Sequence, residues 1–287
     1  MLKTHLPLVL CLGLVACGGG GGGIPPIITS GNYLTVAQEA LSSSKYLLDT
    51  SALANGPPPA TGSCPGGGSI AVTVHDVNGN GKLDAGDSFT MDMTRCQYPG
   101  MTLDGSLAVS VNTLAGDMST NIYALGASLT FTNLTTTTAA STTSGNGIIG
   151  LALSSRGLND QTASITSPSL VTLQTYANVS QSLTLTNVSV TQTLTPTGTG
   201  FSSSFAASGS FGSSAFNNNS LTLTNITPFV RSSTQNYPAS GQLVVADATH
   251  RQVRMTALDS TRVQIEVDAG ANGRYDLSVT KLWSELL

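Results

Sequence analysis

The amino-acid sequence predicts a mainly β protein: a large curved antiparallel sheet, built as a meander, an open half-barrel or a sandwich, with one N-terminal amphipathic helix. Three observations predict it. A phrase that alternates apolar residues with Thr, as a half-buried strand does, recurs at residues 128–134, 182–188 and 220–226. Residues 33–49 carry apolar side chains at helical spacing. Only 9% of the 287 residues are charged, against about 25% in ordinary globular domains, and the formal net charge of -4 excludes a nucleic-acid binder.

Residues 1–16 have the features of a secretory signal peptide, with Lys3 before an apolar stretch that is too short for a stable membrane span. The tetrapeptide Leu14-Val15-Ala16-Cys17 resembles the lipobox of bacterial lipoproteins. This resemblance implies cleavage before Cys17 and attachment of acyl chains, palmitate among them, to Cys17. In that family Asp after the lipidated Cys signals inner-membrane retention. Gly18 stands there, so the resemblance implies the outer membrane, with the periplasmic or cell-surface face undetermined. An ordinary signal peptide cleaved after Ala16 is the alternative.

Residues 17–32 form a tether rich in glycine, and residues 33–287 are expected to form a single β-rich domain. Residues 33–49 predict its one helix, with Leu34, Ala37 and Leu41 on the same face. Thr35 and Gln38 are spaced as a capping box, and the Asn-Gly-Pro-Pro-Pro run at residues 55–59 would end any helix.

Two cysteines remain once Cys11 leaves with the signal peptide and Cys17 carries lipid. An even pair in an oxidising compartment predicts a disulfide between Cys64 and Cys96. Two reduced thiols at a metal or catalytic site are the alternative, but the mature chain has only two histidines to join them.

Further strands are expected around residues 103–111, 148–153, 170–173, 243–246, 253–257 and 263–267. The three copies of the recurring phrase are 54 and 38 residues apart, which argues against a solenoid or propeller, because those folds need a regular period. The expected arrangement is one sheet with the helix against its apolar side, and a two-sheet sandwich is the rival.

Residues 161–230 contain no Asp, Glu, Lys, Arg or His, and 38 of these 70 residues are Ser, Thr, Asn or Gln. The simplest explanation is that Thr suits strand surfaces without any charge. The functional interpretation is a neutral surface that packs against envelope saccharide or against another copy of the chain. Such strands lack the Lys and Glu residues that usually block edge-to-edge pairing.

Residues 76–87 carry the one pattern typical of ion binding, with oxygen-bearing side chains at loop positions 1, 3, 5, 9 and 12 and Gly81 at position 6. The loop resembles the calcium loop of EF-hand-like and dockerin-like proteins, which implies one calcium ion. The ligands implied are Asp76, Asn78, Asn80, the Lys82 carbonyl, Asp84 and Asp87.

This loop departs from the family in two ways. Asp87 stands where Glu is more common, and the flanking residues 69–74 and 88–93 have the pattern of strands, so the loop would join a β-hairpin. The alternative is an Asn-Gly hairpin turn without metal. Cys64 precedes the leading strand and Cys96 follows the trailing one, so the disulfide is expected to staple the hairpin shut and to fix the ends of the loop. Residues 268–276 repeat the pattern in a degenerate form, with Gly270 in place of a ligand.

Catalytic signals are weak, and the chain is expected not to be an enzyme: it has no Gly-x-Ser-x-Gly motif, and the neutral segment offers no paired carboxylates. The leading hypothesis is an outer-membrane-anchored lipoprotein of the cell envelope that calcium stabilises, with a structural or surface-interaction role. The alternative is a periplasmic amphiphile or lipid carrier with an apolar cavity under the helix, similar to the half-barrel of lipoprotein-localisation carriers.

Overall fold

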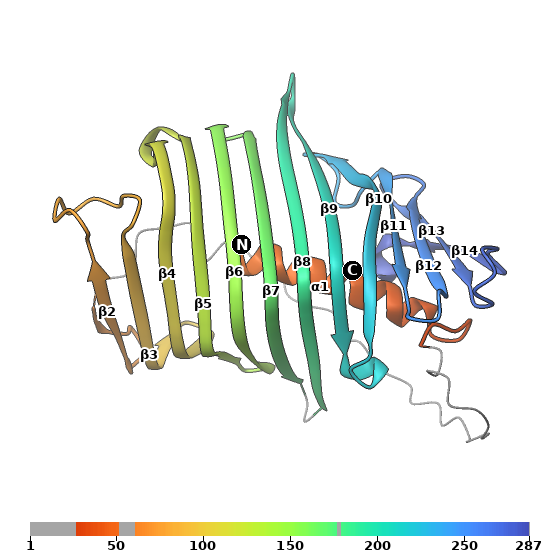
Figure 1. Cartoon of the computed structure of the whole chain (residues 1–287), viewed down its shortest axis with the longest axis horizontal. Helices are drawn as coiled ribbons and strands as arrows, with labels where there is room; N and C mark the ends of the chain where they lie inside the picture. Colours follow the sequence, from red (N-terminus) through yellow and green to blue (C-terminus); the bar gives the residue numbers. More distant parts are fainter. Residues whose placement is uncertain (1–26, 52–60, 177–178, 287) are drawn as a thin grey trace.

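The computed structural model describes residues 27–51, 61–176 and 179–286. These residues form a 14-stranded antiparallel sheet in which each strand pairs with its neighbours in sequence (Figure 1). The predicted meander is therefore confirmed. The sandwich is wrong for the described residues, because all fourteen strands belong to one sheet. No pairing among these residues joins the first strand to the last, so the sheet is open.

The strands are β1 (Gly62–Ser63), β2 (Ser69–His75), β3 (Ser88–Tyr98), β4 (Met101–Asp117), β5 (Ile122–Thr138), β6 (Ser141–Gly157), β7 (Asp160–Tyr176), β8 (Val179–Thr197), β9 (Gly200–Ser213), β10 (Ser220–Ser232), β11 (Ser240–Ala246), β12 (Gln252–Ala257), β13 (Arg262–Asp268) and β14 (Leu277–Leu282). Short 3-10 helices follow β4, β9 and β14. Every strand expected from the sequence lies inside one of these strands.

Three strands, β1, β9 and β14, have no counterpart among the expected ones. β9 consists mainly of Ser, Gly and Ala, which have little preference for a strand. It is extended because β8 and β10 pair with its two edges. The neighbouring strands therefore override a weak local signal.

The helix α1 (Tyr33–Ser51) starts where the sequence predicts and ends two residues later. It runs across the strands on one face of the sheet (Figure 1) and packs against β7, β8, β9, β11 and β12. Val36, Ala37, Ala40 and Leu47 are fully buried in this contact. The apolar stripe of the helix therefore faces the apolar side of the sheet, as expected.

The predicted capping box is wrong, because the helix begins at Tyr33 and already includes Thr35. Gln38 instead donates from Nε2 to the carbonyl of Glu285, 2.9 Å away near the C-terminus. Asn32 organises the start of the helix: its Oδ1 accepts from the backbone N–H of Thr29 at 2.9 Å, and its Nδ2 donates to the carbonyl of Ile27 at 2.7 Å.

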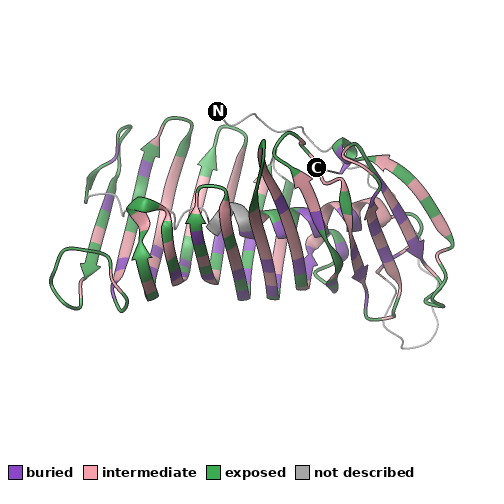
Figure 2. Ribbon diagram, turned by 90° about the horizontal axis from the view of Figure 1, so that it is seen from above, coloured by how far each residue is buried: buried purple, intermediate pink, exposed green. Residues whose placement is uncertain are grey.

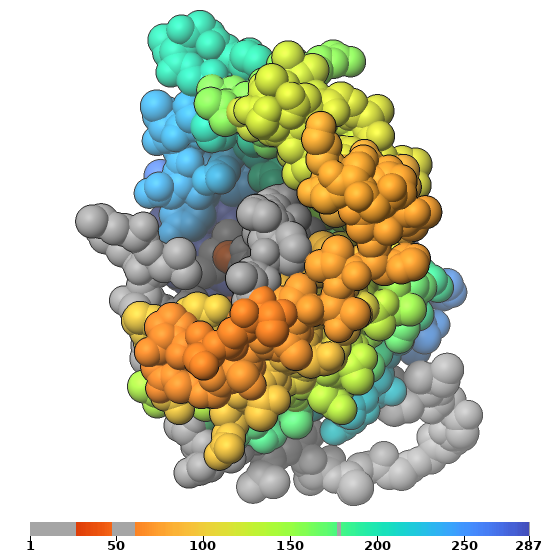
Figure 3. All heavy atoms as spheres, turned by 90° about the vertical axis from the view of Figure 1, so that its left-hand side faces the viewer, coloured from red at the N-terminus to blue at the C-terminus, as the bar shows by residue number. Residues whose placement is uncertain are grey.

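A row of β-bulges crosses the sheet from β3 to β11. At each bulge one strand carries a residue with positive φ, and the register with a neighbour shifts. We call this row the bulge line, and its residues are Arg95, Gly105, Asn133, Gly147, Asn187, Gly209 and Gly241. Because a bulge bends its strand and increases the local twist, bulges in register curve the sheet as a whole. In the space-filling view of Figure 3, the described part of the chain has a curved outline.

The bulge line also keeps apolar side chains on the helix side of the sheet. In β8, Leu185 and Val188 are both buried in the core although they are three positions apart, because the bulge at Asn187 resets the alternation. The backbone groups freed at two bulges find partners in the next strand. Asp104 accepts from the N–H of Arg95, and Asn146 accepts from the N–H of Asn133, both at 2.7 Å.

Buried residues alternate with exposed ones along most strands (Figure 2), so the sheet has an apolar inner face and a polar outer face. Trp283 closes the core at the C-terminal end and is fully buried. Its Nε1 donates to the carbonyls of Pro238 and Asp259, 3.1 and 3.2 Å away, and its ring meets Phe229 edge-on with centroids 5.7 Å apart. Trp283 therefore anchors this end of the sheet.

Candidate metal loop and neutral sheet face

The candidate metal loop, residues 76–87, joins β2 to β3 as expected. Asp76 accepts from the backbone N–H groups of Gly79 and Gly81 at 2.6 and 2.7 Å. The N–H of Gly81, more than that of Gly79, holds the pKa of Asp76 below its ordinary value of 3.8. Both glycines have positive φ, which lets the chain fold around the carboxylate. Asp76 is thus ionised and central to the loop.

The two asparagines of the loop, Asn78 and Asn80, bond both to the loop backbone and to Asp84. Asn78 Oδ1 accepts from the N–H of Asn80 at 3.1 Å, and Asn80 Oδ1 accepts from the N–H of Lys82 at 2.7 Å. Their amide nitrogens both donate to Asp84 Oδ2, at 2.9 and 2.6 Å. These two bonds lower the pKa of Asp84. Asp84 therefore lies next to Asn78 and Asn80, the two predicted amide ligands, and its carboxylate accepts from their side-chain N–H groups.

Asp87 lies at the base of the loop and is 3% exposed. Its two oxygens accept from the N–H groups of Val77 and Asp84 at 3.0 and 2.7 Å, so it closes the loop onto the hairpin. Within the part of the chain that the structure describes, no three acidic, His or Cys side chains are grouped closely enough to hold a metal ion. The carboxylates of the loop are instead engaged by N–H groups of the loop itself.

The second loop, between β13 and β14, has similar backbone bonds, although Asp268 accepts from the fourth and fifth residues after it and Asp76 from the third and fifth. Asp268 accepts from the N–H groups of Asn272 and Gly273 at 3.2 and 2.8 Å, as Asp76 does from its own loop, and Asn272 accepts from the N–H of Arg274 at 2.8 Å. Ala271 and Gly273 have positive φ, matching Gly79 and Gly81. A calcium-loop sequence pattern therefore suffices for this turn, even where Gly270 removes a ligand.

The disulfide between Cys64 and Cys96 is confirmed, with the two Cα atoms 5.3 Å apart. It staples the β2–β3 hairpin, as expected, but it does not fix the ends of the metal loop. It ties the open end of the β2–β3 hairpin, whereas the metal loop closes the other end, with the length of β2 between them. Although the two cysteines flank the loop in sequence, the disulfide is not beside the loop, because β2 and β3 lie between them.

We expect the double substitution Cys64→Ser and Cys96→Ser to destabilise the protein by roughly 3–4 kcal/mol, because the unfolded chain gains the freedom of a loop of about 32 residues. Urea unfolding of the mature domain measures this. Unreduced wild type treated with the same buffer is the control, and an unchanged midpoint in the variant would contradict a structural role.

The segment without charge becomes one continuous part of the sheet. Residues 161–230 make up almost all of β7, β8, β9 and β10, four adjacent strands near its middle. Their outward side chains are mostly hydroxyls and amides, Thr186, Ser208 and Thr224 being exposed examples. A sequence property spread over 70 residues is thus a single neutral surface, which we call the neutral face.

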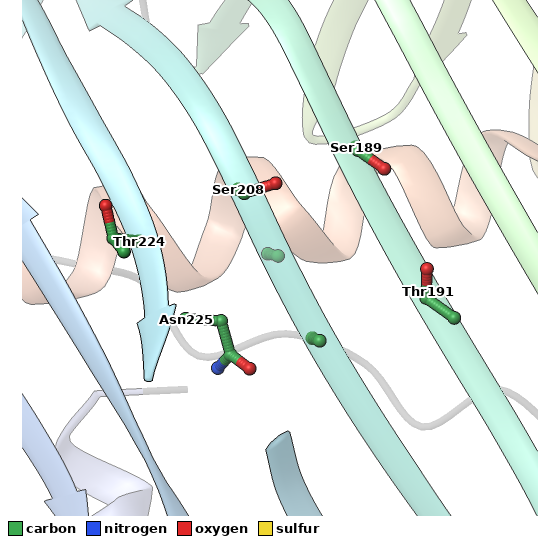
Figure 4. A pocket seen from close by; sticks show the side chains of 7 residues that line it. Ser189, Thr191, Ser208, Thr224 and Asn225 are labelled. Carbon is green, nitrogen blue, oxygen red and sulfur yellow. The ribbon is translucent and has the colours of Figure 1, made fainter. Parts of the chain in front are cut away.

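A shallow depression of about 230 Å³ lies on the neutral face (Figure 4). It forms where β9 and β10 separate: Leu223 pairs with Gly209, but the next pair is Phe229 with Phe205, so β10 has two extra residues. Its lining residues are Ser189, Thr191, Ala206, Ala207, Ser208, Thr224 and Asn225. Asn225 is held at its rim by donating from Nδ2 to the carbonyls of Thr227 and Gln242 at 3.1 and 3.2 Å.

Asp247, in the turn between β11 and β12, is a structural centre that the sequence analysis missed. Its Oδ2 accepts from the backbone N–H groups of both Ile27 and Ile28, each at 3.0 Å. Its Oδ1 accepts from the N–H and hydroxyl of Thr249 and from the N–H of Arg251. The Asp-x-Thr pattern signals the turn, but the bonds to residues about 220 positions earlier leave no local signal.

The arginines near the C-terminus form no common anion site. Arg254 pairs with Glu266 at 2.7 Å and lies over the ring of Tyr275, whereas Arg262 pairs with Asp259 at 2.6 Å in a turn. Arg251 donates to the carbonyl of Ile28 at 3.3 Å. Each of these cations has a partner of its own.

The predicted signal peptide, lipobox and Cys17 lie outside the described residues, as does most of the tether. Of the helices in the described ranges, none combines the length and apolar character of a membrane span. No protein-family model matches the chain, and the chain has no significant match among curated proteins or solved structures.

Proposed function

We propose that this protein is a non-enzymatic lipoprotein of the bacterial outer membrane, anchored through Cys17, that presents the neutral face to an envelope partner. The observation that carries the proposal is the continuity of that face over β7–β10. A charge-free surface of hydroxyls and amides can hydrogen-bond a neutral partner, such as envelope saccharide or another copy of the chain, without desolvating any ion. The lipobox supports the anchor.

Substitutions on the neutral face test the surface-interaction role. Ser208→Glu and Thr224→Glu place charges on exposed positions beside the depression, whereas Thr130→Glu places one on the outer side of β5. We expect the first two to reduce cosedimentation of the mature domain with purified envelope polysaccharide, or its self-association in analytical ultracentrifugation, at unchanged melting temperature. Equal behaviour of all three variants and the wild type in both assays would reject the proposal.

The anchor has its own test in cells. Labelling with radioactive palmitate is expected to mark the wild type and not Cys17→Ser. If neither band is labelled, the anchor is rejected. Protease treatment of intact cells then separates the cell-surface from the periplasmic face.

We further propose that the loop at residues 76–87 binds one calcium ion. The chemistry of the donor set supports this: three carboxylates, two amides and the Lys82 carbonyl are hard oxygen donors of the kind calcium prefers. The ion would bind the Asp84 carboxylate in place of the amide N–H groups of Asn78 and Asn80, and it would link the two sides of the loop. Its effect is to stabilise the β2–β3 hairpin.

For the calcium site, the second loop supplies a matched control. Asp76→Ala and Asp268→Ala each remove two comparable bonds from backbone N–H groups. We expect calcium to raise the melting temperature of the wild type and of Asp268→Ala, and to have no effect on Asp76→Ala. Titration calorimetry should give heat in the same two proteins. A wild type without calcium heat and without a calcium-dependent melting shift would exclude the site.

The amphiphile carrier is a second candidate, favoured by the apolar inner face of the sheet. That face continues through Leu107, Leu129 and Ile149 on β4, β5 and β6, beyond the strands that α1 contacts most. A carrier predicts saturable binding of a fluorescent fatty acid by the mature domain, with a blue-shifted emission. Unchanged emission over the titration would remove this candidate.

A further inference from the structure

The first described residues are fixed at one end of the strands. Ile27 and Ile28 are bonded to Asp247 in the β11–β12 turn, and Arg251 of the same turn donates to the carbonyl of Ile28. Ile28 is fully buried, and Asp247 is 5% exposed. The chain therefore enters the fold at a defined point, in a contact that is shielded from water.

The meander divides the turns between two ends. Because consecutive strands are antiparallel neighbours, the turns after β9, β11 and β13 lie at the end where Ile27 is bound, which we call the anchored end. The turns after even-numbered strands lie at the opposite, free end. They include the metal loop after β2 and the turn after β12. The bulge line bends strands without reversing them, so this division holds for the whole sheet.

The predicted tether is short compared with the molecule. Ile27 follows Cys17 by ten positions, so the tether spans at most about 35 Å when extended. A flexible glycine-rich chain of this length has a root-mean-square span of about 18 Å. β12 alone, with six residues, separates the two ends by about 20 Å. The longest strand, β8, has 19 residues and spans about 60 Å. Because even the extended tether is shorter than this, it favours a bilayer on the side of the anchored end.

We infer that the protein stands on the lipid bilayer with its anchored end toward the headgroups and its free end, with the metal loop, pointing away. This inference rests on the proposed attachment through Cys17. The free end also carries exposed apolar side chains, Val77 at 61% and Leu158 at 72% among them. In this orientation they face the aqueous space instead of the membrane.

Energy transfer to the bilayer tests the orientation. The mature chain, from Cys17 onward, is coupled through Cys17 to a maleimide lipid in phosphatidylethanolamine–phosphatidylglycerol vesicles that contain rhodamine lipid. A donor dye is attached to p-azidophenylalanine at Ala248 or at Leu258, two exposed positions at opposite ends of β12. We expect higher transfer from position 248 than from 258. Equal transfer, or the reverse order, would overturn the inference.

A longer tether is the matched control. Insertion of 20 Gly and Ser residues after Gly23 should reduce the difference between the two positions, since the domain then reorients more freely. A difference that is unaffected by the insertion would show that the tether does not set the orientation. Chemical coupling makes this result independent of acylation in the cell, which the palmitate experiment tests separately. Failure of one proposal is thus distinguishable from failure of the other.

Discussion

Gly209→Ala is expected to destabilise the protein by roughly 2–6 kcal/mol, the sum of a strained backbone and overpacking at about 1–3 kcal/mol each. Gly209 has a φ of +125°, which side chains rarely adopt, and an added Cβ would lie 2.5 Å from the carbonyl oxygen of Asn187 and from Cα of Val188. These are backbone atoms of the adjacent strand, so the clash cannot be relieved by rotating a side chain. Because Gly209 belongs to the bulge line, the substitution forces β8 and β9 apart.

The control for this prediction is Gly198→Ala, in the turn between β8 and β9. Its added Cβ would meet no atom within 4 Å, and its φ is not in the left-handed region. We expect its stability to stay within about 0.5 kcal/mol of the wild type. Urea unfolding and thermal melting measure both variants. Similar stability of Gly209→Ala and Gly198→Ala would show that the bulge line is not required for the fold.

Asp247→Ala is the second large prediction, with an expected loss of about 3 kcal/mol. The carboxylate accepts bonds from Ile27, Ile28, Thr249 and Arg251, and its removal leaves the buried N–H of Ile28 without an acceptor. Asp117→Ala is the matched control, because Asp117 makes the same turn with Ser119 but is exposed. Urea unfolding compares the two. Hydrogen exchange at the amides of Ile27 and Ile28 should accelerate only in Asp247→Ala.

The effect of Asp247 depends on pH. Burial opposes ionisation, but bonds from the Thr249 hydroxyl and the N–H of Ile28 outweigh it, so the pKa of Asp247 lies below its ordinary value of 3.8. A carboxylate with a lowered pKa in the folded state stabilises the fold above the unfolded pKa, and this contribution is lost as the pH falls through the folded pKa. The stability difference between wild type and Asp247→Ala should therefore be constant from pH 7 to about 5 and shrink below about 4. A constant difference down to pH 2 would contradict the ionised contact.

The candidate metal loop shows which structural features a local sequence pattern can predict and which it cannot. Its turn follows from Asp76, Gly79 and Gly81, which are within six residues of one another, and the second loop repeats that turn. The hydrogen-bond partners of Asp84 and Asp87 could not be predicted from nearby residues. Asp87 closes onto Val77 through the β2–β3 pairing, and Asp84 is engaged by two amide nitrogens. Composition identified the donors, and packing decided what each carboxylate contacts.

The recurring phrase also predicts the bulges, through a break in its regular alternation of apolar and polar residues. In its first two copies the apolar residue after Asn breaks the period of two, and Asn133 and Asn187 are the residues with positive φ in the bulge line. Asn tolerates this conformation better than most residues, so the break predicts a bulge. In the third copy Asn225 has no positive φ and stands at the rim of the depression. The same phrase thus has two structural outcomes, which the neighbouring strands select.

The sequence by itself determined the features that depend on residues close together in the chain: the helix, most strands, the turn of the metal loop and the number of cysteines available for a disulfide. Only the tertiary structure decided that β9 is a strand, that the bulges align into one line, and that Asp247 holds Ile27 and Ile28. The physical reason is sequence separation. These features require partners from other strands, up to 220 positions away, and the energy of such contacts is distributed over residues that show no common local pattern.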